Sequence, residues 1–180
     1  MIRLRAYLLL LPMIPTTYAA ETTCVHPDVS RLKHMCAMVG MRMKDNSGRN
    51  PYLFQTRFQE AACIPENATE SREEQYAKIR GAWAANEDKM LCSGASFDLK
   101  DGNILKFAVS NKFDDFIFAA IKWRVNLNRI DTTDGQTLLD YIQYHRDQHQ
   151  ANPLGNTYQF YYNRFREAGA KHRKELPNSE

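Results

Sequence analysis

Two histidines, His145 and His149, stand four residues apart in YIQYHRDQHQ, the spacing at which a helix presents two side chains on one face. Such a pair can bind zinc, but a zinc protease needs a glutamate directly after the first histidine, and this chain has Arg146 there. A third ligand is not evident in the sequence. We therefore interpret both histidines as solvated side chains on a polar helix face, and we predict no metal ion and no other cofactor.

The neighbouring carboxylates Asp114 and Asp115 are the next candidates for acid–base chemistry. Adjacent helix positions point in different directions, so two such side chains do not face one reacting group. They are better interpreted as acidic residues that favour the start of a helix. The sequence also lacks a glycine-rich phosphate loop and a nucleophile elbow. We predict no catalytic residues and a protein that is not an enzyme.

The first twenty residues, MIRLRAYLLLLPMIPTTYAA, have the composition of a secretory signal peptide. A short basic start is followed by an apolar block from Tyr7 to Ile14, which is interrupted by Pro12 and followed by small residues. The block is too short to span a bilayer. We expect cleavage after Ala19 or Ala20 and a mature, exported chain without a membrane anchor.

The charge balance gives no indication of a nucleic-acid partner. The whole chain has a formal net charge of +3, which falls to +1 when Arg3 and Arg5 leave with the leader. The sequence also has no long run of lysine and arginine.

Four cysteines, Cys24, Cys36, Cys63 and Cys92, lie in the exported part. In an exported chain they predict two disulfides, for which three pairings are possible. An antiparallel hairpin of the first two predicted helices would favour Cys24 with Cys63 and Cys36 with Cys92, because bridged α-carbons lie within about 7 Å. Residues 93–180 contain no cysteine and must be held by packing alone.

Apolar residues at helical spacing predict three helices in the first half of the chain. The first runs from Pro27 to Lys44 and ends at the turn-rich loop KDNSGRNP. The second runs from Tyr52 to Ala62, and a polar linker follows it. The third runs from Gln75 to Met90.

The second half contains a repeat of 33 residues. DGNILKFAVS begins at Asp101 and DGQTLLDYIQ begins at Asp134, and Leu105 and Leu139 follow at a separation of 34. An aromatic residue comes two positions after each of these leucines. A period of this length is typical of one turn followed by two short helices.

Within the first copy we expect ILKFAVS and FDDFIFAAIKW to be paired helices, because their apolar residues do not alternate as strands require. Gly102 and Gly135 are expected to supply the positive φ of a tight turn. FREAGAKHRKEL, from Phe165, is expected to be a closing helix that Gly169 terminates.

These features resemble ankyrin-repeat proteins from about Tyr76 to Leu176, with two full units and a partial first one. The resemblance implies an all-α fold, in which a disulfide-stapled helical hairpin precedes two to three ankyrin-like helix-turn-helix repeats. The predicted organisation is a signal peptide over 1–20, a stapled helical region over 21–71 and an ankyrin-like region over 72–180. An unrelated α-helical bundle is the alternative.

The chain departs from the ankyrin pattern in three places. The threonine-proline-leucine-histidine signature appears only as NILK and TLLD, and Arg124-Val125 replaces a glycine-alanine helix end. The last repeat is predicted to carry an insertion from Asp147 to Thr157, because Pro153 and Gly155 interrupt a continuous helix.

Ankyrin-like stacks bind other proteins with their turn tips and first helices. A small, exported binder of this kind resembles the periplasmic ankyrin-type immunity proteins of Gram-negative bacteria, which neutralise a partner toxin, commonly one from a type VI secretion system. The resemblance implies a protein partner and a periplasmic location. The alternatives are a periplasmic scaffold or stress-protection partner of an endogenous enzyme, and a metal-binding or enzymatic protein built around His145 and His149.

The residues expected to contact the partner lie at the turn tips and on the first-helix face of each repeat. They are Lys100, Asp101, Asn103, Lys106, Asn111, Lys112, Asp131, Thr132, Asp134, Gln136 and Asp140. The predicted insertion over 147–157 is a second candidate, since loops added to a repeat usually belong to its binding face.

Overall fold

The architecture comes from a computed structural model that describes residues 32, 34–43, 51–94 and 97–177. In these residues the chain forms seven α-helices and one two-stranded sheet, which confirms the all-α prediction. The elements in chain order are α1 (Met35–Met38), α2 (Leu53–Ala61), α3 (Arg72–Ala84), the 3-10 helix η2 (Glu87–Lys89), β1 (Leu91–Cys92), β2 (Gly102–Asn103), α4 (Ile104–Asn111), α5 (Asp114–Trp123), α6 (Leu138–Gln148), α7 (Pro153–Glu167) and the 3-10 helix η3 (Arg173–Glu175).

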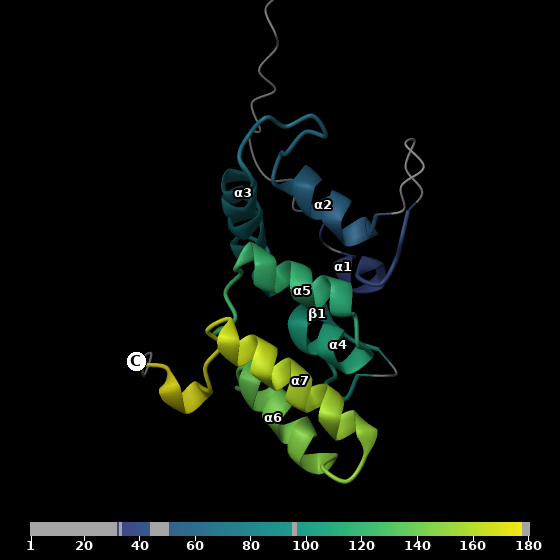
Figure 1. Ribbon diagram of the computed structural model, residues 1–180, viewed down its shortest axis with the longest axis vertical. Coiled ribbons are helices and arrows are strands. Elements are labelled where there is room, and N and C mark those ends of the chain that lie inside the picture. The colour runs from purple at the N-terminus through teal and green to yellow at the C-terminus, as the bar shows by residue number, and fades with distance from the viewer. Residues whose placement is uncertain (1–31, 33, 44–50, 95–96, 178–180) are drawn as a thin grey trace, which may run out of the picture.

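The helices pack as successive pairs, α2 with α3, α4 with α5 and α6 with α7 (Figure 1). The pairs stack on one another, because α3 contacts α5 and α4 contacts α6. The two apolar runs of the first repeat copy are the helices α4 and α5, as the sequence predicted. A single cluster of buried apolar residues runs through the stack, from Leu32 to Ala170.

Aromatic rings join the stapled part of the chain to the first repeat copy. Phe58 of α2 stacks on Trp83 of α3 with centroids 5.3 Å apart. Phe54 of α2 meets Phe116 of α5 edge to face at 5.1 Å, and Trp123 packs against both α2 rings. All five rings are buried. Edge-to-face and offset-stacked rings stabilise a core beyond the area that they bury.

The disulfide between Cys36 and Cys92 ties α1 to β1, with α-carbons 5.5 Å apart. This confirms one half of the favoured pairing. Cys63 is also disulfide-bonded. The other half of the pairing involves Cys24, which, like the predicted signal peptide, lies outside the described residues.

Four helices end in the same hydrogen-bonded turn. Cys63, Lys112, Arg124 and Gly169 have φ between 55° and 92° after α2, α4, α5 and α7. In each case the next residue's N–H donates to the carbonyl five residues earlier, at 2.9–3.2 Å, which is the Schellman motif. The predicted stop at Gly169 is confirmed, and Arg124 takes the left-handed conformation that glycine would adopt more easily.

The first predicted helix is wrong over the part that the structure describes. The helix α1 covers only Met35–Met38. At Arg42 the backbone is already extended and forms an antiparallel bridge with Tyr52. The Met43 N–H donates to the Pro51 carbonyl at 3.0 Å. The apolar spacing of this segment therefore reflects burial in a short helix followed by an extended stretch. Residues 27–31 and 33 lie outside the described residues.

The third predicted helix is displaced toward the N-terminus. The helix α3 begins at Arg72 because the Ser71 hydroxyl accepts from the Glu74 N–H while the Glu74 carboxylate accepts from the Ser71 N–H. This reciprocal capping box starts the helix inside the stretch expected to be a linker. The helix then ends at Ala84.

The predicted interruption of the helix within 147–157 is confirmed, but it is shorter than a loop of that length, because only residues 149–152 lie outside the helices. The helix α6 continues to Gln148 and α7 begins at Pro153, the first helical position, where proline is favoured. Asn152 caps α7 by accepting from the Leu154 N–H at 2.9 Å. Gly155 lies inside α7, where a β-carbon would stand 2.3 Å from the His149 carbonyl oxygen.

The two Asp-Gly pairs use their glycines differently. Gly135 has a φ of 69° in a turn closed by a hydrogen bond from its N–H to the Asp131 carbonyl, as expected. Gly102 does not have a positive φ and instead pairs with Cys92 in the sheet. A β-carbon on Gly102 would lie 2.6 Å from the Phe97 ring, so glycine is needed there to let this ring pack directly against the backbone.

Replacing Gly102 by alanine is expected to lower the free energy of unfolding by about 1–3 kcal/mol, because the new methyl group overlaps Phe97 in a packed core. Gly81→Ala in α3 is the matched control. Its β-carbon would meet no heavy atom within 4 Å, and the change should raise the free energy of unfolding by up to about 1 kcal/mol. Urea unfolding measures the free energy of unfolding of each variant. Equal changes in the two variants would contradict the explanation that Phe97 leaves no room for a side chain at residue 102.

Candidate functional site

The two Asp-Gly segments lie side by side because Lys106 reaches from α4 into the turn that precedes α6. Its Nζ lies 2.7 Å from Asp134 Oδ1 and 3.2 Å from Asp131 Oδ2. The same ammonium group donates to the Gln136 carbonyl at 3.2 Å. The Asn103 N–H also donates to Asp131 Oδ2, at 2.8 Å. The contacts of Lys106 with Asp134 and Gln136 join the two repeat copies, and the contacts with Asp131 tie α4 to the turn just before the second copy.

Burial corrects two of the predicted contact residues. The side chains of Lys106 and Asp131 are only 1% and 2% exposed, so neither lies on an open first-helix face. Burial by itself raises the pKa of Asp131, but hydrogen bonds from Asn103 and Thr133 and the charge of Lys106 outweigh it and leave the pKa below its usual value. Lys106 therefore joins the repeat copies through Asp134 and Gln136, and Asp131 fixes the turn between them on α4.

Asp140 is held in a similar way at the start of α6. Its carboxylate accepts from the Thr137 N–H and hydroxyl in a capping box, and from the Arg173 N–H at 3.0 Å. It also lies 2.8 Å from Nδ1 of His172. Burial raises the pKa of Asp140, yet these donors outweigh burial and lower the pKa overall. Asp140 is thus an anchor for the C-terminal segment.

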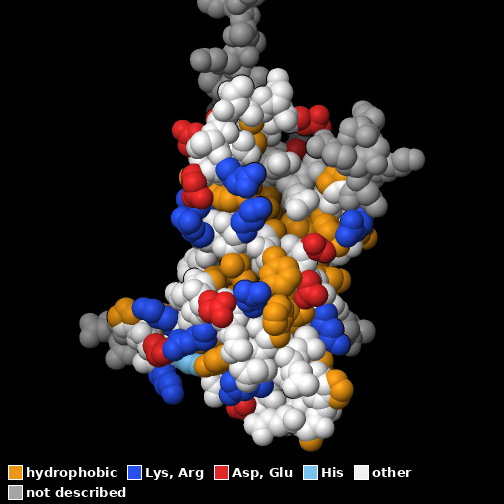
Figure 2. Space-filling view, viewed as in Figure 1, with side chains coloured by type: hydrophobic (Ala, Val, Ile, Leu, Met, Phe, Trp, Pro, Cys, Tyr) orange, Lys and Arg blue, Asp and Glu red, His pale blue; other side chains and the backbone are white. Residues whose placement is uncertain are grey.

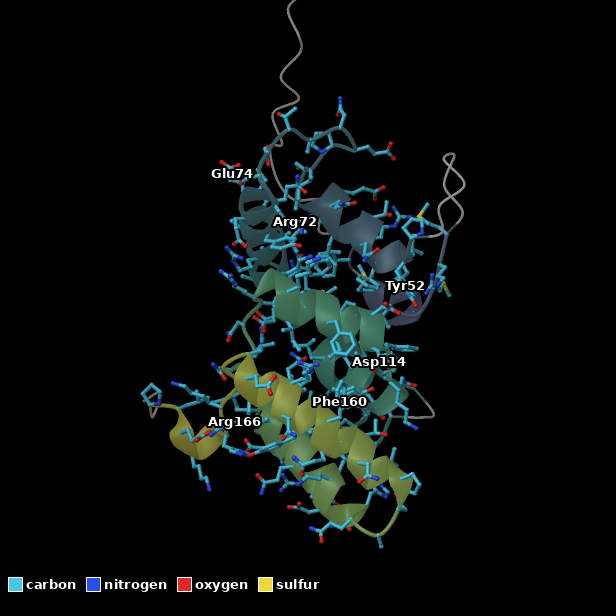
Figure 3. All side chains as sticks on the ribbon, viewed as in Figure 1. Tyr52, Arg72, Glu74, Asp114, Phe160 and Arg166 are labelled. Carbon is cyan, nitrogen blue, oxygen red and sulfur yellow. A yellow bond between two sulfur atoms is a disulfide. The ribbon has the colours of Figure 1, made fainter. Side chains whose placement is uncertain are left out.

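The C-terminal segment after α7 is fastened against α6 by further polar contacts. The Tyr162 hydroxyl lies 3.0 Å from His172 Nε2, so both nitrogens of this buried ring have partners. The Arg173 guanidinium donates to the Gly135 carbonyl at 2.8 Å. Arg166, labelled at the end of α7 in Figure 3, pairs with Glu175 at 2.6 Å.

Between α6 and this segment runs a groove of about 620 Å³, which we call the α6 groove. The α6 side chains in it recur at spacings of three and four, so they share one helix face. Tyr144 is 55% exposed there. The groove is lined by Gln136, Asp140, Gln143, Tyr144, Asp147, His172, Arg173 and Lys174.

The structure brings only some of the predicted contact residues together. Gln136 and Asp140 line the α6 groove, and Thr132 is exposed at the neighbouring turn tip. Four further predicted contact residues are exposed or half-buried and lie in the segments that precede α4 and α6. They are Lys100, Asp101, Asn103 and Asp134. Asn111 and Lys112 lie at the opposite end of α4, roughly 12 Å along a helix of eight residues.

The α6 groove contains residues that the sequence interpretation missed. The polar stripe of Gln143, Tyr144 and Asp147 follows the helical period and could have been found from it. Arg173 and Lys174 form the opposite wall because the C-terminal segment folds back onto Asp140. No local pattern in the sequence indicates that contact.

His145 in α6 and His149 just after it are half-buried rather than solvated as predicted, and they do not converge on a common point. Their rings lie 6.4 Å apart and nearly parallel, and both stack on Tyr158 of α7. Asp98 accepts from the Tyr141 hydroxyl at 2.6 Å and contacts His145 Nε2 at 3.1 Å. Burial lowers the pKa of His145, and the Asp98 carboxylate opposes this only in part.

The described part of the chain contains no group of three or more His, Cys, Asp and Glu side chains placed to hold a metal ion. None of the helices within it is long and apolar enough to cross a membrane. In comparisons with known proteins, no family model, no curated protein and no solved structure matched the chain.

Lys106→Met is expected to lower the free energy of unfolding at pH 7 by about 3–5 kcal/mol, because it leaves the carboxylates of Asp131 and Asp134 without their buried counter-charge. Lys112→Met is the control, since it removes an exposed lysine just after the same helix and should change stability by less than about 0.5 kcal/mol. Denaturant unfolding measures both. A Lys106→Met protein as stable as the control would show that the network does not hold the repeats.

The lowered pKa values of Asp131 and Asp140 predict a specific pH dependence. A carboxyl group whose pKa is lower in the folded state stabilises the fold above its unfolded pKa of about 3.9, and this stabilisation is lost as the pH falls toward the folded pKa. The free energy of unfolding should therefore decrease as the pH falls below about 4. Asp131→Asn should reduce that slope, and a stability that stays constant from pH 6 to pH 2.5 would contradict the assignment.

Proposed function

We propose that this chain is an exported, ankyrin-like protein-binding module that acts as a periplasmic immunity protein and neutralises a partner antibacterial toxin. The observation that carries the proposal is the α6 groove, whose walls are held together by several hydrogen bonds while Tyr144 is exposed and charged groups line the groove. A rigid groove loses little conformational entropy on binding.

The composition of the groove suits a protein partner. Tyrosine and arginine are the residue types that most often dominate binding energy at interfaces, and Tyr144 and Arg173 occur here together. Asp147 on one wall and Lys174 on the other present both signs of charge. Charges arranged in this way give a protein interface its register and its selectivity more than its raw affinity.

The ankyrin-like part of the proposal is supported by three features of the stack. The Asp-Gly segments recur at 33 residues, each leads into a helix, and helix pairs stack with the first helices α4 and α6 in contact. In such arrays each unit contacts its neighbours and the turns form one continuous surface. The exposed turn residue Thr132 would extend the binding face beyond the groove.

Export is supported by the leader composition and by the cysteines. The first twenty residues have the order of charged, apolar and small segments of a signal peptide. A structural disulfide such as Cys36–Cys92 persists in oxidising compartments, of which the bacterial periplasm is one.

The test is affinity capture of the exported protein from periplasmic extract, followed by co-expression with each captured protein. We expect one captured protein to be toxic when exported alone and harmless when this chain is present. Capture of a non-toxic endogenous enzyme would instead favour a periplasmic scaffold. If no captured protein is toxic, the immunity proposal is wrong.

Tyr144→Ala is expected to raise the dissociation constant for the captured toxin at least tenfold, because it removes the most exposed aromatic ring of the groove. Gln148→Ala is the matched control on the same helix, since Gln148 is exposed but does not line the groove, and it should leave affinity within about twofold of the parent. Calorimetry or surface plasmon resonance measures both. Equal affinities for the two variants would place the contact elsewhere.

A further inference from the structure

The α6 groove continues into a second hollow near the other end of α6. This hollow has a volume of about 330 Å³ and is formed by the end of α6 and the first half of α7. It is lined by Arg146, Asp147, Gln150, Gly155, Asn156 and Gln159. Because Asp147 also lines the α6 groove, the two hollows meet at this residue. Together they form one depression along α6, which we call the α6 furrow.

A polar stripe follows the furrow from one end to the other. It consists of Gln136, Asp140, Gln143, Asp147 and Gln150, at spacings of four and three residues that keep them on one side of the helix. From first to last the stripe covers about 20 Å at the helical rise per residue. An extended chain of about six residues has the same length. The furrow therefore has the length of a short peptide segment.

Both carboxylates of the stripe already have partners inside the chain. Asp140 is occupied by the start of α6 and by the C-terminal segment. Asp147 accepts from Nε of Arg146 at 2.9 Å. The hydrogen bond and the charge of Arg146, with further hydrogen bonds from Gln150 and Gln143, hold the pKa of Asp147 below its usual value. The negative charge that lines the furrow is thus compensated within the protein.

The cations on the opposite wall are not compensated in this way. The Arg173 guanidinium donates to the Gly135 carbonyl, which is uncharged. Within the described residues, neither Arg173 nor Lys174 forms an ion pair with a carboxylate. The neighbouring Glu175 pairs with Arg166 instead.

The unmatched cations belong to a basic segment that is open to solvent. Lys171, Arg173 and Lys174 are all exposed. Figure 2 shows Lys and Arg side chains gathered at this C-terminal segment. Two of the three, Arg173 and Lys174, line the furrow. A partner that carries carboxylates would supply the missing counter-charge.

The carboxamides of the stripe favour an extended partner segment over a helical one. Gln143 and Gln150 each donate to Asp147, but a carboxamide has a second N–H and a carbonyl oxygen that accepts. Gln136 and Asn156 bring the same groups to the two ends of the furrow. An extended chain presents backbone N–H and C=O groups that need such partners. A helix uses most of these groups internally.

We propose that the α6 furrow binds an extended, acidic segment of a partner protein. Carboxylates of the segment pair with Arg173 and Lys174, its backbone lies along the carboxamides of α6, and Tyr144 packs against one of its side chains. The inference rests on the proposed function of the groove as a protein-binding site. It adds the charge and the conformation of the part that is bound.

A nucleic acid fits the furrow less well than an acidic peptide does. Asp140 and Asp147 lie seven residues apart along α6 and would repel a continuous row of phosphates. A peptide can place its carboxylates beside Arg173 and Lys174 and uncharged residues beside the two aspartates. The whole chain also has a formal net charge of only +3.

Selection from a phage-displayed library of random peptides tests the proposal on the intact exported protein, without a known toxin. We expect the retained peptides to contain more Asp and Glu than the unselected library. Their affinity should fall as the salt concentration rises, because exposed charges are screened. Carbon-13 chemical shifts of a labelled, bound peptide should have the values of extended backbone.

Charge reversal then locates the binding site. Lys174→Glu should raise the dissociation constant of a retained peptide about tenfold, because it replaces an attraction by a repulsion. Lys171→Glu is the matched control, since it makes the same change of charge in the same segment at an exposed residue that does not line the furrow. It should leave the dissociation constant within about twofold of the parent value.

Several results would overturn the proposal. They are retained peptides rich in Lys and Arg, a library that yields no binder, helical chemical shifts in the bound peptide, and equal losses of affinity in the two charge reversals. A single-stranded oligonucleotide that binds in a Lys174-dependent manner, while no acidic peptide is retained, would assign the furrow to nucleic acid instead.

The proposed function is decided by separate results. If acidic peptides bind the furrow but no captured protein is toxic, the immunity proposal is wrong and the furrow inference stands. If a toxin is captured and Lys174→Glu leaves its affinity unchanged, the toxin binds elsewhere. The immunity proposal then stands and the furrow inference is wrong.

Discussion

The ammonium group of Lys106 fixes how the two repeat copies stack. It is buried in α4 and contacts two carboxylates and a carbonyl of the turn that precedes α6. A buried charge is tolerated only where its partners are present at short distance, so this helix and this turn have one favourable relative position. Through that turn the network also sets the start of α6, the location of Asp140 and therefore the docking of the C-terminal segment.

Much of the helical stack could be predicted because it depends on patterns within about 35 residues. The Asp-Gly repeat and the apolar runs identified α4, α5 and α6 closely. Helix boundaries that depend on capping were harder to predict. The start of α3 was placed too late, although the Ser71 to Glu74 capping box was present in the sequence. The conformation of Gly102 could not be predicted, since its role depends on the Phe97 ring lying against it in the folded chain.

The candidate site was predicted less well than the fold, and Lys106 shows why. A lysine between isoleucine, leucine and phenylalanine on a short helix was interpreted as a contact residue, while its burial depends on Asp131 and Asp134, more than 24 residues away. The groove wall formed by Arg173 and Lys174 depends on an equally distant contact with α6. Side chains that only tertiary contacts bring together leave no periodic signal in the sequence.

The Cys36–Cys92 bond has a consequence for the order in which the cysteines are oxidised. It encloses Cys63, so a chain that oxidises from its N-terminus onward meets two other thiols before Cys92 appears. Exchange among wrong bonds takes seconds to hours, depending on the oxidant and on any isomerase present. Correct oxidation therefore favours a chain that keeps Cys36 reduced until the sheet residues around Cys92 arrive, or one that a disulfide isomerase can revisit.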